Sequence, residues 1–95
     1  MTAFAIGQLR IHNTDWMEEY TGKISHLIQR HQGKVIAKGL PETLEGNSEL
    51  PSVLICIEFP DQQHAKAWYH DPENQKLVTL RQTGSSFELL LVEGV

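Results

Sequence analysis

Cysteine is nearly absent from this sequence, which has Cys56 alone among its 95 residues. A single cysteine excludes an intrachain disulfide, a paired-cysteine zinc site and an iron–sulfur cluster held by one chain. Because Cys56 lies within an apolar run, we interpret it as a core residue. We expect no cofactor.

Long apolar runs are missing as well. The longest are Val53–Ile57 and Leu89–Val92, far short of the roughly 20 residues that a membrane-spanning helix needs. The first residues contain no basic segment followed by a long apolar stretch, so no signal peptide is expected. We therefore expect a soluble, cytoplasmic protein without a membrane contact.

Positive charge is scarce and scattered. The chain has 8 Lys and Arg residues against 12 Asp and Glu residues, a formal net charge of -4 and a pI near 5.6. Because the basic residues form no stripe that would follow a phosphate backbone, nucleic acid is not an expected partner.

Several catalytic and binding motifs are absent too. The sequence has no glycine-rich phosphate loop, no serine nucleophile elbow and no Cys/His pair at a usable spacing, which argues against nucleotide binding and covalent catalysis. His12, His26, His64 and His70 lack the helical spacing of a ligand pair and a carboxylate placed to complete the set. No metal site is predicted.

The patterns that are present begin with a strand and a helix. Ala3–Ile11 has residues suited to a strand with two distinct faces. Apolar residues then recur at three- and four-residue steps, which predicts one helix with one buried face: Trp16, Tyr20, Ile24, Leu27, Ile28 and His31. Asn13 or Thr14 is expected to cap this helix, and Gly33 to close it in the left-handed conformation.

Three further strands are predicted. The second covers 34–38, and 42–45 is expected to continue it as a twisted or bulged extension. The third covers 52–59 and the last 87–93. Between these two, Asp61 caps a short helix, and Asp71 followed by Pro72 starts another helical segment.

The order of elements is β-α-β-β-α-β, for which the economical packing is α+β: a four-stranded antiparallel sheet with the helices on one face. We expect this to be one domain over residues 1–95. The third and fourth strands are apolar on both faces, so the face without helices also needs a cover. The same face of a second copy is the simplest cover, which predicts a homodimer.

Short motifs are spread over nearly the whole chain: Gly7-Gln8-Leu9-Arg10, the helix of Tyr20, His31-Gln32-Gly33-Lys34, Leu44-Glu45-Gly46, Ile57-Glu58-Phe59-Pro60, Ala67-Trp68-Tyr69, Asp71-Pro72-Glu73-Asn74-Gln75, Leu80-Arg81 and Leu91-Val92-Glu93-Gly94. Through these motifs the chain resembles the domain of unknown function 1330 family, most specifically from Glu58 to Arg81. The resemblance implies a ferredoxin-like fold assembled as a dimeric α+β barrel. The wider superfamily is similar in fold to small monooxygenases, muconolactone isomerase, haem-degrading enzymes and stress-induced barrel proteins, so no single activity follows.

Three residues are candidates for catalysis. His31 is either an acid, base or ligand-binding group in a cleft between helix and sheet, or a helix-terminal histidine bonded to nearby carbonyls. Arg81 either holds a carboxylate or an enolate, or forms a structural ion pair with Glu58. Tyr69 either directs its hydroxyl into a pocket or is buried with a single hydrogen bond.

Further residues are candidates for ligand binding. Trp68 is a pocket wall or a core anchor. Gln8 and Arg10 reach a solvent-filled cavity or mark the rim of the sheet, and Glu58 belongs to this set through its possible contact with Arg81.

Three functional hypotheses follow. The first is a small protein that binds an acidic or aromatic organic molecule in the cleft between helices and sheet. The second is a cofactor-independent oxygenase or isomerase, in which His31 or Tyr69 moves a proton while Arg81 stabilises negative charge. The third is a stress or interaction protein with a filled barrel and no active site.

Overall fold

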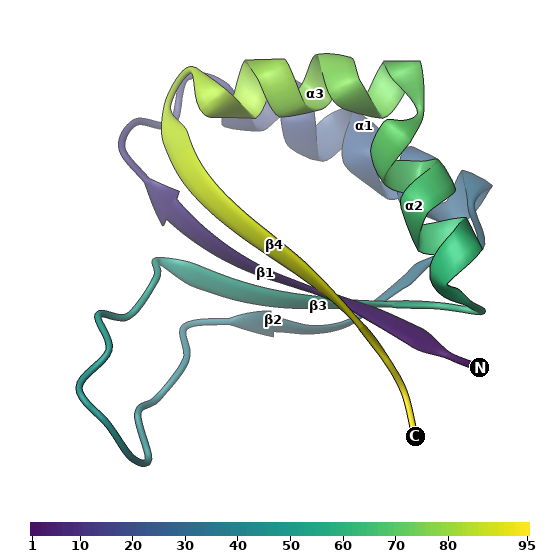
Figure 1. Cartoon of the computed structure of the whole chain (residues 1–95). Coiled ribbons are helices and arrows are strands. Elements are labelled where there is room, and N and C mark those ends of the chain that lie inside the picture. The colour runs from purple at the N-terminus through teal and green to yellow at the C-terminus, as the bar shows by residue number, and fades with distance from the viewer.

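The computed structural model describes residues 1–95, and its four strands form one antiparallel sheet in the order β2-β3-β1-β4. The strands are β1 (Ala3–Ile11), β2 (Lys34–Gly39), β3 (Val53–Phe59) and β4 (Ser85–Glu93). Three helices cover one face of the sheet: α1 (Met17–Arg30), α2 (Gln62–His70) and α3 (Pro72–Gln82) (Figure 1). The predicted α+β ferredoxin-like fold is confirmed.

The central strand β1 determines what each face of the sheet carries. Its small residues Ala3, Ala5 and Gly7 are buried beneath the helices. Ala5 lies opposite Ile57 of β3 and Leu91 of β4, so these larger side chains fill the same layer. The core contains eight buried apolar residues, namely Ala5, Leu27, Ile28, Ile57, Phe59, Ala65, Trp68 and Leu77.

Gly7 is required by a close approach within this layer. A Cβ atom at this position would overlap the ring of Phe87 and would lie 2.9 Å from Cγ2 of Ile55. The absent side chain thus leaves room for an aromatic ring across the strand pair, as glycine often does in sheets. That ring forms part of the candidate site described below.

The predicted ends of α1 are wrong in detail. Neither predicted residue caps its N-terminus, because the Oδ1 atom of Asn13 instead accepts a hydrogen bond from the N–H of Asp15 (3.2 Å). At the other end Gln32, not Gly33, has the left-handed backbone (φ 61). Gly33 is needed for a different reason, since a Cβ atom there would press against the ring of Phe59.

The predicted extension of β2 is also wrong, because residues 42–45 form no strand. Gly39 already pairs with Leu54, so an extension would require partners before Val53, where Pro51 has no N–H to donate. The irregularity that the sequence indicated lies earlier, as a register shift between residues 35 and 37.

Both predicted aspartate caps are confirmed. Asp61 accepts a hydrogen bond from the backbone N–H of His64 (2.8 Å), and Asp71 accepts one from the N–H of Glu73 (2.9 Å). These two caps give α2 and α3 their separate starts, with a change of direction between them (Figure 1). None of the helices is long and apolar enough to cross a membrane.

The second face of the sheet has no helix over it (Figure 1). Leu90 and Val92 are exposed there, by 63% and 48% of their surface. Cys56 lies opposite Ile6 on this face and is only partly buried, so its interpretation as a core residue is wrong. The apolar character of both faces, which the sequence indicated, is therefore present in the folded chain.

Candidate functional site

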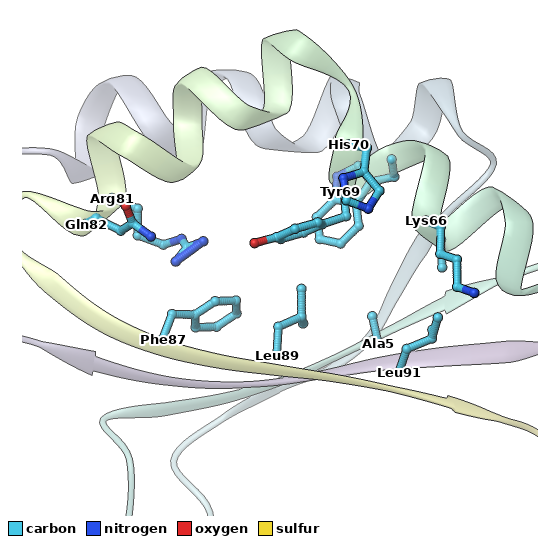
Figure 2. A pocket seen from close by; sticks show the side chains of 11 residues that line it. Ala5, Lys66, Tyr69, His70, Arg81, Gln82, Phe87, Leu89 and Leu91 are labelled. Atoms are coloured by element: carbon cyan, nitrogen blue, oxygen red, sulfur yellow. The ribbon is translucent and has the colours of Figure 1, made fainter.

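A cavity of about 350 Å³ lies between the helical layer and β4. Its wall on the helix side comes from α2 and the end of α3, and its floor from β1 and β4 (Figure 2). It is lined by Ala5, Ala65, Lys66, Trp68, Tyr69, His70, Arg81, Gln82, Phe87, Leu89 and Leu91. Its size is within the range of small-molecule sites in proteins.

Arg81 is the charged group of this cavity. It lies in the last turn of α3 and is only 4% exposed, yet it forms no ion pair with any carboxylate. Its Nε atom is buried without a hydrogen-bond acceptor. Its guanidinium carbon lies 4.2 Å from the centre of the Phe87 ring and 5.9 Å from that of Tyr20. The guanidinium therefore lies against aromatic rings and has no carboxylate beside it.

Burial also affects the pKa of Arg81. Loss of solvation lowers the pKa of Arg81 from its ordinary value, while the neighbouring Tyr20 and Tyr69 act in the opposite direction. The guanidinium nevertheless stays protonated at any physiological pH, because its ordinary pKa is so high. The cavity thus contains a permanent cation that lacks a counterion.

Tyr69 and Trp68 belong to the last turn of α2 and line the same cavity. The hydroxyl of Tyr69 points toward the guanidinium of Arg81 (Figure 2). Trp68 is 5% exposed, and its Nε1 atom has no acceptor. Trp68 is therefore both core anchor and cavity wall, since its ring centre also lies 5.4 Å from that of Phe59.

A second, smaller cavity of about 160 Å³ lies between α1 and the sheet. Most of its lining is apolar, with side chains from α1, β3 and α3. It shares five lining residues with the first cavity: Trp68, Tyr69, Arg81, Phe87 and Leu89. Arg81 and Tyr69 therefore line both cavities.

His31 does not join Tyr69 and Arg81, because it lines neither of these cavities. It lies directly after α1, where its Nε2 atom is 2.8 Å from Oδ2 of Asp71. Arg30 approaches the same carboxylate oxygen at 3.2 Å. The helix-terminal contact of His31 is therefore with the Asp71 carboxylate, and not with the backbone carbonyls that the sequence indicated.

The remaining candidates lie on the face away from the helices. Arg10 donates hydrogen bonds to Oε1 of Glu49 (3.1 Å) and to the carbonyl of Leu50 (3.0 Å), which holds the end of the β2–β3 loop at the rim of the sheet. Gln8 is on the same face of β1. Glu58 lies opposite Phe4 of β1, so the possible Arg81–Glu58 ion pair is not formed.

Sequence reasoning missed several residues of the larger cavity. Lys66 lies three positions before Tyr69 and four before His70 on α2, so helical periodicity could have placed Lys66 on the same side of the helix as these two residues. His70 is the histidine that lines the cavity, and its ring centre lies 5.3 Å from that of Tyr69. No three His, Cys, Asp or Glu side chains lie close enough together to hold a metal ion.

The cluster around Asp71 predicts a pH dependence of stability. Hydrogen bonds from His31, from the N–H of Glu73 and from Arg30 lower the pKa of the Asp71 carboxyl below 3.8. The folded state therefore binds fewer protons than the unfolded state, and the stabilisation is complete above pH ~4 and lost as pH falls through the folded pKa. We expect Asp71→Asn to flatten the acid side of a plot of Tm against pH between 7 and 2.

A control for this experiment is Asp15→Asn, because the side chain of Asp15 is exposed and forms no ion pair. This variant should keep the acid slope of the unmodified protein. Equal acid slopes for the unmodified protein and Asp71→Asn would contradict the assignment.

Solved structures share the fold over nearly the whole chain. A protein of unknown function from Rhodopseudomonas palustris is 17% identical with a TM-score of 0.81, covering 99% of this chain and 82% of that chain. A dimeric ferredoxin-like protein of unknown function from Jannaschia sp. is 13% identical with a TM-score of 0.74, covering 99% and 100%. The cofactor-independent oxygenase SnoaB from Streptomyces nogalater is 12% identical with a TM-score of 0.67, covering 99% and 93%.

These similarities concern the fold alone, because all three identities are low. No curated protein matches the sequence significantly. The family model described as "Domain of unknown function (DUF1330)" matches residues 2–95. Since that match covers almost the entire chain, the protein belongs to the DUF1330 family.

Proposed function

We propose that this protein binds a small organic anion, a carboxylate or an enolate, in the cleft between its helices and its sheet. The observation that carries the proposal is Arg81, a cation that is 4% exposed, borders two cavities and has no acidic partner. Buried charges in proteins are normally paired, and an isolated one is costly. A bound anion would supply the missing counterion.

The surroundings of Arg81 favour a ligand with an apolar body. Phe87, Leu89 and Leu91 form the floor from β4 (Figure 2). Trp68 and Tyr69 supply aromatic surface and, at their polar atoms, hydrogen-bond donors. Aromatic carboxylates combine the required charge with a flat apolar ring.

The test is titration calorimetry with benzoate, phenylacetate and cinnamate, using the unmodified protein and Arg81→Met. Methionine keeps an unbranched side chain and removes the charge. Hydrogen bonds to charged groups contribute about 1.5–3 kcal/mol, so we expect affinity to fall about 10- to 100-fold. Native mass spectrometry of freshly purified protein would also show any retained ligand as added mass.

The matched control is Lys66→Met, which removes an exposed cation that lines the same cavity. An exposed charge contributes little, so affinity should change less than about threefold. Equal binding of all three acids by the Arg81→Met protein and the unmodified protein would overturn the proposal.

A second candidate function is cofactor-independent catalysis of the oxygenase or isomerase type. It is supported by the Tyr69 hydroxyl pointing at Arg81, an arrangement in which Tyr69 moves a proton while Arg81 stabilises the developing negative charge. The fold shared with SnoaB is consistent with this candidate. In this form of the proposal His70, not His31, is the histidine at the cleft.

We also propose that the chain pairs with a second copy through the sheet face that no helix covers. Leu90 and Val92 are exposed on this face, and Ile6 and Leu54 extend the apolar surface across β1 and β3. A two-fold axis would place this face against itself, as in closed homodimers. The similar protein from Jannaschia sp. is described as dimeric, which supports the pairing.

A further inference from the structure

Asn74 is the most deeply buried polar side chain of the protein, at 1% exposure. It lies in the first turn of α3 and lines the smaller cavity, together with Arg81 from the last turn of the same helix. Its Oδ1 atom has no hydrogen-bond donor. A buried carbonyl without a donor is rare in folded proteins and requires a reason.

A structural role accounts poorly for this residue. Its single hydrogen bond runs from Nδ2 to the carbonyl of Tyr69 at 3.3 Å. The Nε2 atom of Gln75 donates to the same carbonyl at 2.6 Å, so that carbonyl has a better partner without Asn74. The reverse orientation of the amide would set two oxygen atoms against each other, so the free atom is the acceptor.

Asn74 and Arg81 are seven residues apart, two turns of one helix, and therefore share one face of α3. Their Cα atoms are separated by about 10 Å along the helix axis. Helical side chains lean toward the N-terminus, which brings the guanidinium back toward Asn74. An oxygen without a donor and a cation without an ion-pair partner thus line the same cavity, two turns apart on one helix.

We propose that Asn74 is a second recognition group for the ligand of Arg81, and that the ligand class is aromatic acids that carry a hydroxyl or amino group opposite the acid. The donor of the ligand binds Oδ1 of Asn74 while the anion binds Arg81. This inference rests on the proposed function. The smaller cavity, about 160 Å³, matches the volume that holds a single six-membered ring.

The test compares three pairs of acids by titration calorimetry: benzoate, phenylacetate and cinnamate, each with its 4-hydroxy derivative. For at least one pair, the unmodified protein should bind the hydroxylated member about fivefold more tightly, the effect of one neutral hydrogen bond. In the Asn74→Leu protein, the affinity for the hydroxylated acid divided by that for its parent acid should fall to one or below. In the control Thr79→Val, which changes an exposed residue of the same helix outside both cavities, the preference for the hydroxylated acid should persist.

The outcomes separate the two proposals. Absence of binding for all six acids overturns the proposed function and this inference together. Binding that depends on Arg81, with no hydroxyl preference or with a preference that survives Asn74→Leu, overturns the role of Asn74 alone.

A second measurement needs no ligand. If Asn74 is kept for recognition, the unliganded Asn74→Leu protein should have a Tm equal to or above that of the unmodified protein, because an unsatisfied buried oxygen has been removed. A decrease of more than about 4 °C would assign Asn74 to the fold and overturn the inference.

Discussion

Replacing Phe59 by alanine is expected to lower the free energy of unfolding by about 3–5 kcal/mol. Phe59 is completely buried at the end of β3, where its ring fills the space above Gly33 and contacts the ring of Trp68 at 5.4 Å between centres. Backbone hydrogen bonds hold β3 and α2 in place, so the backbone cannot close over the void that the missing ring leaves. The free energy of unfolding of a small domain is about 5–15 kcal/mol, so this one substitution removes a large share of the stability.

The substitution also tests how the core supports the cleft. Trp68 lines both cavities and its ring packs against that of Phe59. In the Phe59→Ala protein the Trp68 ring should therefore lose its fixed position. Affinity for aromatic acids should then fall even at temperatures where the variant remains folded. Urea denaturation followed by tryptophan fluorescence measures the first effect, and calorimetry with benzoate measures the second.

The variant Phe59→Leu provides the control, with a smaller expected loss than Phe59→Ala because leucine leaves a smaller cavity. A loss below about 1 kcal/mol for Phe59→Ala would contradict the central place given to this ring.

Local signals explain which parts of the fold could be predicted from the sequence. Asp61 and Asp71 cap helices through hydrogen bonds to residues two or three positions away, so short-range chemistry is sufficient to find them. The extension of β2 depended on what lies opposite it on β3, which no local pattern of 42–45 contains. The role of Gly33 likewise depends on Phe59, a residue 26 positions away in the sequence.

The difference between local signals and long-range contacts also explains which site residues could be predicted. Tyr69 and Arg81 were predicted as candidates, and the structure places both in one cavity because the inner faces of α2 and α3 converge there. Glu58 could have been separated from Arg81 in advance, since strand alternation directs it away from its buried neighbours Ile57 and Phe59. His31 could not, because its contact with Asp71 joins elements 40 residues apart.

The free donors and acceptors of the cleft lay beyond any sequence argument. The sequence identifies Arg81 as a candidate but not Asn74, and only the packed chain shows that Nε of Arg81 and Oδ1 of Asn74 have no partners. Composition cannot show which polar atoms stay unsatisfied. The structure therefore supplied the observation on which both ligand proposals depend.

Leu90→Glu is expected to convert the proposed dimer to monomer. Leu90 is 63% exposed on the open face of β4, in register with Ile6 of the neighbouring strand. In a two-fold symmetric dimer each substitution occurs in both subunits. Two buried leucines would therefore be lost, and two carboxylates would be placed in an apolar interface. Loss of leucine burial alone, at about 1.5–3 kcal/mol for each side chain, predicts a dimer dissociation constant more than 100-fold higher.

Size-exclusion chromatography with light scattering at micromolar concentration measures the change in mass directly. Thr79→Glu is the charge-matched control, because Thr79 is exposed on α3 in the helical layer and lies away from the open face of the sheet. This variant should elute with the mass of the unmodified protein. A monomeric mass for the unmodified protein, or a dimeric mass for Leu90→Glu, would contradict pairing through this face. Because Arg81 and Asn74 lie on the opposite side of the sheet, the Leu90→Glu monomer should still bind aromatic acids, which separates assembly from ligand recognition.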